Sequence, residues 1–176
     1  MNVFKRAWAS IESTVSPRHF YRLSGLWLPW FAWPAAILLS VGLIWGLAIA
    51  PEDYQQGNSY RIIFIHVPAA SLAMGGYLLL AICAVISLVW RVKTADAVAR
   101  AAAPVGALFC LLALITGSLW GKPTWGTYWV WDARLTSMLI LLFLYCGVMA
   151  LQQAFDSQSQ GSKASALLAL VGVINL

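Results

Sequence analysis

Residues 62–90 read IIFIHVPAASLAMGGYLLLAICAVISLVW, and no Lys, Arg, Asp or Glu interrupts them. A helix needs about 20 apolar residues to cross the roughly 30 Å hydrocarbon core of a bilayer. This stretch is longer than that, and a helix bonds its backbone polar groups internally, as a lipid environment requires. It is therefore predicted to be a transmembrane helix.

Four other apolar stretches without a charged residue surround it: residues 23–51, 101–121, 135–155 and 164–176. The first three are long enough to span a bilayer, whereas the last is too short and is predicted to be a helix cut off at the end of the chain. The expected fold class is all-α, a polytopic integral membrane helical bundle with four complete transmembrane helices and a truncated fifth. Residues 1–176 are expected to form a single membrane domain.

The composition excludes an ordinary water-soluble domain. Of the 176 residues 61% are hydrophobic, only 10% are charged, and ten are tryptophans. The net charge of +5 follows the loops and does not gather on one face, so membrane lipid and not nucleic acid is the expected partner. The first apolar stretch begins too late and runs too long for a cleavable signal peptide, so this helix is expected to be retained.

The basic residues divide unequally between the two sides of the membrane that these spans define. One side carries Lys5, Arg6, Arg18, Arg22, Arg91, Lys93, Arg100 and Lys163, and the other carries Arg61, Lys122 and Arg134. The positive-inside rule places the first group, and with it the N-terminus, in the cytoplasm. Two loops then face outward, one around residues 51–61 and one over residues 120–134.

The second outward loop is rich in tryptophan and reads WGKPTWGTYWVWDAR over residues 120–134. Gly121, Pro123 and Gly126 favour a loop over a helix. One interpretation is an aromatic belt at the membrane interface. The other is a shelf of indoles for a flat ligand, in which each aromatic contact contributes about 0.5–1.5 kcal/mol beyond area burial.

The geometry of that shelf depends on the backbone. Trp125 and Trp129 share a face if the segment turns helically, whereas Trp129 and Trp131 share one if it is extended.

The segment WGTYWVWD, residues 125–132, resembles the tryptophan-rich WWD signature of haem-handling proteins in cytochrome c biogenesis. Other segments narrow the resemblance: YQQGNSYR at 54–61, HVPAA at 66–70, GSLWGKP at 117–123 and WDARLTS at 131–137. They are similar to the haem exporter protein C (CcmC) family of the bacterial cytochrome c maturation pathway, and the similarity covers essentially the whole chain.

The resemblance implies an inner-membrane protein of six spans whose periplasmic WWD domain holds haem b, as transported ligand, between two axial histidines. The first histidine matches His66, and the second lies beyond residue 176. The residues expected to contact haem are His66, Trp120, Trp125, Tyr128, Trp129, Trp131, Arg61 and Arg134. The partners implied are a periplasmic haem chaperone, the ABC transporter subunits of the system and a small single-span membrane protein.

Pro68 favours the first turn of a helix, so the second span is predicted to begin near it and to leave His66 at the outer interface. A neutral imidazole there can bind haem iron, or it can simply bond to a loop carbonyl. Arg61 and Arg134 are the preferred partners of the haem propionates.

Both arginines have a second interpretation. They can pair with Glu52, Asp53 or Asp132, or anchor helix ends. Asp132 and Gly126 are expected to shape the loop, with the Asp132 carboxylate capping the fourth helix.

Two other functions compete with haem transfer. A haem lyase-type membrane enzyme shares the tryptophan-rich signature, but the outward loops carry no thiol and no carboxylate–histidine set for acid–base chemistry. A permease subunit needs charged or polar groups at the middle of the spans, and only neutral ones such as Thr116 and Ser118 occur there. The chain is therefore predicted to bind and transfer haem without catalysing a reaction.

Overall fold

The computed structural model describes residues 17–176, and the predicted cytoplasmic cations Lys5 and Arg6 lie outside this part. The helices in chain order are α2 (Pro17–Ile44), η1 (Trp45–Ile49), η2 (Asn58–Ile62), α3 (Ile63–Trp90), α4 (Lys93–Trp125), α5 (Ala133–Gln153), α6 (Gln158–Gly172) and η3 (Val173–Asn175). Of the short elements, η1 is a π-helical turn, whereas η2 and η3 are 3-10 helices.

The predicted fold class is confirmed. Four helical stretches are long and apolar enough to cross a membrane: His19–Ile49, Asn58–Trp90, Lys93–Trp125 and Ala133–Gln153. At about 1.5 Å per residue the 33 residues of α4 extend about 50 Å, well beyond the roughly 30 Å of hydrocarbon. This helix therefore tilts in the bilayer or projects from it.

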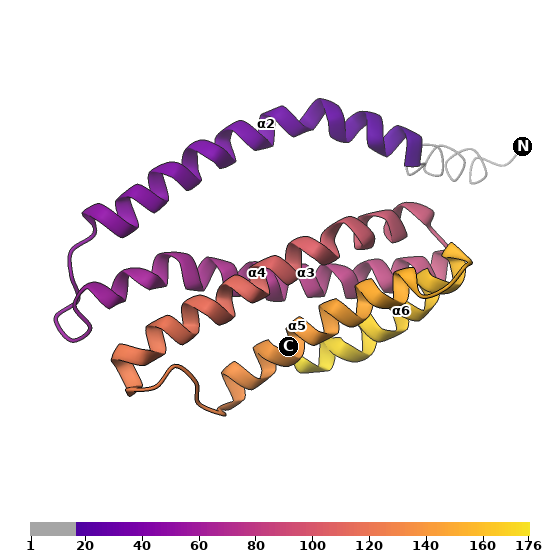
Figure 1. Ribbon diagram of the computed structural model, residues 1–176. Coiled ribbons are helices and arrows are strands. Elements are labelled where there is room, and N and C mark those ends of the chain that lie inside the picture. Colours follow the sequence, from indigo (N-terminus) through magenta and orange to yellow (C-terminus); the bar gives the residue numbers. More distant parts are fainter. Residues whose placement is uncertain (1–16) are drawn as a thin grey trace, which may run out of the picture.

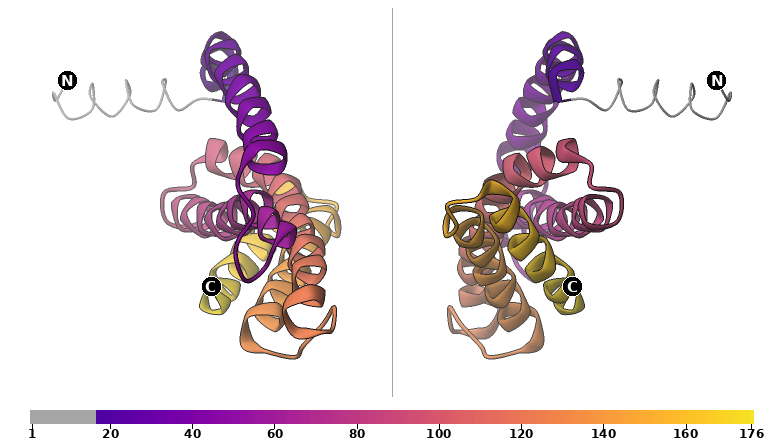
Figure 2. Two further views of the ribbon diagram at one scale, coloured as in Figure 1. Left: turned by 90° about the vertical axis from the view of Figure 1, so that its left-hand side faces the viewer. Right: turned by 90° about the vertical axis from the view of Figure 1, so that its right-hand side faces the viewer.

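Helices α3 to α6 pack side by side, whereas α2 arches over them (Figure 1) and stands apart in both views of Figure 2. From His19 to Ile44 the side chains of α2 are exposed, including those of Trp30 and Trp33, as expected for a helix surrounded by lipid. The π-helical turn η1, which follows α2, meets α3 where the Phe64 ring occupies the place that a Cβ on Gly46 would take.

The four-helix bundle has two ends (Figure 1). At one end α3 and α5 begin and α4 stops. We refer to it as the site end. At the opposite end lie the α3–α4 connection with Arg91, the α5–α6 connection, and the starts of α4 and α6 with Lys93 and Lys163.

Small residues and two tyrosines build the core between α3, α4 and α5. The Tyr145 hydroxyl donates a hydrogen bond to the Ala73 carbonyl at 2.7 Å, and its ring meets Tyr77 edge-on with centroids 5.1 Å apart. Gly106 of α4 gives the Tyr145 phenol its space, because a Cβ there would overlap it. Close backbone approach over small residues is the usual means of packing helices in lipid.

We expect Gly106→Ala to destabilise the bundle by about 1–3 kcal/mol, because the added methyl group overpacks the core against Tyr145. Gly75→Ala is the matched control, since nothing lies within 4 Å of a Cβ at this position on α3. Thermal unfolding in detergent measures both variants. Equal unfolding temperatures for the two would show that Tyr145 is not locked against α4.

Two helix boundaries differ from the prediction. The second span begins at Asn58 with η2 and continues as α3 from Ile63, so Pro68 lies inside a helix and does not start it. Likewise α4 runs through Gly121 and Pro123 to Trp125, and the predicted loop of residues 120–134 shrinks to residues 126–132. These prolines and this glycine do not end the helices, because a continuous helix keeps most backbone groups hydrogen-bonded within a bilayer, where prolines and glycines are tolerated.

Candidate functional site

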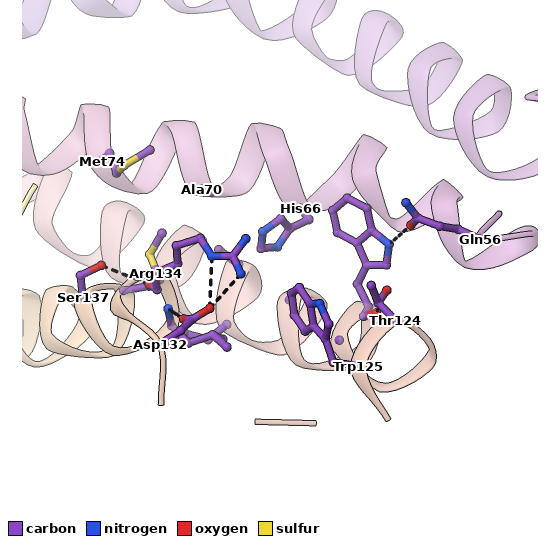
Figure 3. Close-up of a pocket in the computed structure, with 16 residues that line it drawn as sticks. Gln56, His66, Ala70, Met74, Thr124, Trp125, Asp132, Arg134 and Ser137 are labelled. Atoms are coloured by element: carbon purple, nitrogen blue, oxygen red, sulfur yellow. Dashed lines mark hydrogen bonds and ion pairs between the residues drawn. The ribbon is translucent and has the colours of Figure 1, made fainter. Parts of the chain in front are cut away.

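A cavity of about 510 Å³ lies at the site end between α3, α4 and α5. Its walls come from residues far apart in sequence, among them His66 of α3, Trp120 and Trp125 of α4, and Arg134 of α5 (Figure 3). Apolar side chains such as Met74, Leu114 and Met138 line the rest of it. The cavity falls within the range of roughly 300–1,000 Å³ that is typical of sites for small organic ligands.

His66 is half-buried and held against α4. Its Nδ1 lies 3.1 Å from the Thr116 hydroxyl, and its ring meets Trp120 edge-on with centroids 5.8 Å apart. A Cβ on Gly117 would lie 3.0 Å from His66 Cε1, so the absence of a side chain at Gly117 leaves room on α4 for the imidazole. The structure therefore places the imidazole in the wall of the cavity, in contact with one of the predicted tryptophans.

Trp120 and Trp125 reach the same cavity from the last turns of α4. The Trp120 indole N–H donates to the Gln56 side-chain oxygen at 2.7 Å, which ties α4 to the connection before η2. Trp125 is half-exposed and packs over Gly121, where a Cβ would lie 3.1 Å from its ring. Trp120 is thus held by the connection before η2, and Trp125 packs on its own helix.

The remaining predicted aromatics, Tyr128, Trp129 and Trp131, belong to the connection of residues 126–132 and do not line the cavity. Trp129 and Trp131 meet edge-on with centroids 5.3 Å apart, the pairing expected for an extended segment. The Trp129 indole N–H is buried and has no hydrogen-bond partner among the described residues. The single shelf expected from the sequence is therefore divided into a cavity pair, Trp120 and Trp125, and a loop group, Tyr128, Trp129 and Trp131.

Gly126 creates this division by ending α4. Its φ of 78° is in the left-handed region, and its N–H donates to the Lys122 carbonyl at 2.9 Å, a common helix termination. The Lys122 ammonium donates back to the Gly126 carbonyl and lies 5.2 Å from the centre of the Tyr128 ring.

Asp132 and Arg134 border the cavity where α5 begins. The Asp132 carboxylate accepts a hydrogen bond from the Leu135 N–H at 2.8 Å and so caps α5. Its second oxygen pairs with the Arg134 guanidinium at 2.8 Å. Arg134 is mostly exposed and its guanidinium lies 5.3 Å from the Trp125 ring, so the cation stands beside an indole that lines the cavity.

The Leu135 N–H, followed by the Arg134 guanidinium, holds the pKa of Asp132 below its ordinary value. A lowered carboxyl pKa contributes stability above the unfolded value of about 3.9, and this contribution is lost as the pH falls through the folded-state pKa. We expect the Leu135 amide to be protected from hydrogen exchange at neutral pH and to lose protection only below about pH 3.9.

In the Asp132→Asn variant, which retains a capping side chain, the Leu135 amide should be protected from exchange across the whole pH range. In the Asp132→Ala variant it should be unprotected at every pH. Protection factors from hydrogen exchange in detergent measure the three proteins. Loss of protection in the wild type near neutral pH would contradict the assigned cap.

The structure does not bring Arg61 to this cavity. Its guanidinium donates to the Ala50 carbonyl at 2.8 Å and to the Leu47 carbonyl at 3.2 Å, which lie at the end of the first span. This is the helix-anchoring alternative considered for it. As a propionate partner Arg61 stays a prediction that this geometry does not support.

A sequence model of the family described as "Heme exporter protein C" matches residues 10–176. The chain belongs to the haem exporter protein C family. Curated relatives of that name are 53% identical over 169 residues in Escherichia coli K12 and 50% identical over 169 residues in Haemophilus influenzae; each alignment covers 96% of this chain and 69% of the relative. The relative in Bradyrhizobium diazoefficiens is 53% identical over 161 residues, which are 92% of this chain and 61% of the relative.

In this member of the haem exporter protein C family, sequence reasoning missed Thr116, Gly117 and Gln56 as site residues. Thr116 and Gly117 precede Trp120 by four and three positions and therefore share its face of α4, a spacing that could have pointed to them. Gln56 carries no such signal, because its partner Trp120 lies 64 positions away.

Proposed function

We propose that this chain handles haem for the maturation of c-type cytochromes, as an integral protein of the bacterial inner membrane. In this proposal haem b is a transported ligand, held at the site end and passed to a periplasmic haem chaperone. The observation that carries it is the cavity in which His66, two indoles and Arg134 come together. Membership of the haem exporter protein C family supports the same function.

The cavity residues fit the chemistry of haem. The imidazole of His66 is a common axial ligand of haem iron, and the indoles of Trp120 and Trp125 offer flat apolar surfaces to a porphyrin. The apolar lining from Met74 and Leu114 suits the body of the macrocycle. The family resemblance implies a second axial histidine, and the residues that line this cavity include no histidine besides His66.

Arg134 is the propionate partner that the geometry favours. Its guanidinium stands at the edge of the cavity, paired with Asp132 through a bridge that is exposed to solvent. Exposed ion pairs contribute little, so Arg134 can exchange this carboxylate for a propionate at small cost.

The loop group of Tyr128, Trp129 and Trp131 is assigned to the transfer of haem. These rings lie outside the cavity but on the connection that joins two of its walls, α4 and α5. The chaperone collects haem at this loop, and the ABC transporter subunits and the small single-span protein assemble with the membrane helices.

Purification of the whole protein in detergent tests the proposal. A b-type absorption spectrum, or its appearance when haem is added, supports haem handling. Colourless protein that takes up no haem would overturn it, and solute flux in vesicles from the same preparation would favour the permease alternative.

The orientation is tested separately with reporter fusions. Fusions after Gln56 and after Thr127 should report a periplasmic position, because both sites lie at the end opposite the Arg91 and Lys93 cluster. A fusion after Asp156, in the α5–α6 connection, is the cytoplasmic control. Cytoplasmic activity at Gln56 or Thr127 would place the cavity on the wrong side for a periplasmic partner.

A further inference from the structure

Thr116 is the hydrogen-bond partner of His66, and it is nearly fully buried, with 8% of its surface exposed. It lies on α4, 50 positions from His66, directly before Gly117, which lines the cavity. We infer that Thr116 is a positioning residue that holds His66 in the tautomer with the proton on Nδ1, so that Nε2 keeps the lone pair for iron. The part that concerns iron rests on the proposed function, whereas the tautomer does not.

Counting protons assigns the direction of the bond. A threonine hydroxyl has one proton to donate and lone pairs to accept with. The Thr116 hydroxyl lies 2.7 Å from the Leu112 carbonyl, which can only accept, and 3.1 Å from His66 Nδ1. The shorter contact takes the hydroxyl proton, and the Thr116 oxygen then accepts from Nδ1–H.

A second carbonyl strengthens this assignment. The Ala113 carbonyl lies 3.3 Å from the same hydroxyl, so two carbonyl acceptors compete for its one proton. The Thr116 hydroxyl therefore has no proton left to donate to an unprotonated Nδ1. In a neutral imidazole only one nitrogen carries a proton, so Nε2 is the basic nitrogen.

The ring is also restrained from turning over. Gly117 sits next to its Cε1, where even a Cβ would be only 3.0 Å away, and Trp120 meets it edge-on. Rotation of the ring by half a turn would place carbon in front of the Thr116 oxygen and leave this buried oxygen without its donor, which is costly. Gly117 and the Thr116 hydroxyl therefore favour the same orientation of the His66 ring.

The tautomer matters because a nitrogen that carries a proton has no lone pair for a metal. Ligand histidines are generally oriented by a hydrogen bond from their other ring nitrogen, and loss of that partner typically lowers metal affinity by about 10- to 100-fold. Thr116 supplies such a partner before haem arrives, so the site does not have to select a tautomer on binding.

Nitrogen-15 NMR of the haem-free protein in detergent tests the tautomer directly. The chain has two histidines, so ¹⁵N-histidine labelling gives two imidazoles, and a His19→Gln variant identifies the signals of His66. Above the pKa of the ring we expect a protonated, pyrrole-type Nδ1 and a pyridine-type Nε2. The reverse pattern, or an even mixture, would overturn the inference without any variant at Thr116.

Two substitutions then separate the hydroxyl from the shape of the residue. Thr116→Val removes the hydroxyl at nearly constant size and should shift the His66 signals toward a mixture of tautomers, whereas Thr116→Ser should keep the wild-type pattern. On haem addition the Val variant should bind about 10- to 100-fold more weakly, with the Ser variant near wild type. A Val variant with unchanged His66 signals would show that the hydroxyl does not set the tautomer.

The two proposals fail differently. If the wild type shows the Nδ1–H tautomer but binds no haem, the proposed function is wrong and the role of Thr116 in orienting His66 stands. If it binds haem but shows the other tautomer, haem handling stands and this inference is wrong.

Discussion

Replacing His66 with Ala should lower the haem content of the purified protein more than about tenfold. The substitution removes the nitrogen proposed to bind iron, and losing even an orienting partner of such a ligand costs about 10- to 100-fold in affinity. Membrane insertion and thermal stability should stay near wild type, because the half-buried ring packs at the cavity wall and not in the Tyr77–Tyr145 core. Haem per protein, from the pyridine haemochrome spectrum, measures the effect.

His19→Ala is the matched control, since His19 lies near the start of α2 and does not line the cavity. We expect its haem content to equal that of the wild type. Unchanged haem content in His66→Ala would exclude His66 as a ligand and move the iron site elsewhere in the protein.

The second large effect is expected from the double substitution Trp120→Ala and Trp125→Ala. Each indole contributes about 0.5–1.5 kcal/mol of aromatic contact, so the pair contributes about 1–3 kcal/mol. At about 1.4 kcal/mol per tenfold change, haem affinity should fall by about 5- to 140-fold, and further through lost apolar burial. Haem titration of the detergent-solubilised protein measures the dissociation constant.

Trp129 and Trp131 of the loop group provide the matched control, because they carry the same side chains. Trp129→Ala with Trp131→Ala removes the same number of indoles from outside the cavity, so haem affinity should change less than about twofold while transfer to the chaperone slows. An equal loss of affinity in the two double variants would mean that the four rings form one shelf around the haem and that the division into a cavity pair and a loop group is wrong. Wild-type behaviour of both would leave the tryptophans as an interfacial belt.

The fold class and the four spans could be predicted from the amino-acid sequence alone. Uncharged apolar stretches such as residues 62–90 decide this locally, because each helix in lipid must satisfy its own backbone and needs only enough apolar length. The capping of α5 by Asp132 was also predictable, since a cap depends on residues three positions apart. The helix boundaries near Pro68 and Pro123 were predicted wrongly, because propensities measured for water underrate how strongly a bilayer favours an unbroken helix.

Which of the expected haem residues share a cavity depends on how the helices pack, and this could not be predicted from the sequence. His66 meets Thr116 and Trp120 because α3 and α4 pack closely along their whole length, and no local pattern records which residues of two packed helices face each other. Arg61 and Arg134 are both arginines near the start of a predicted span. The Arg61 guanidinium donates to carbonyls at the end of the first span, whereas the Arg134 guanidinium lies beside Trp125. The reason is general: length and polarity place a residue at a membrane depth, whereas the rotation and crossing of the helices determine what it touches at that depth.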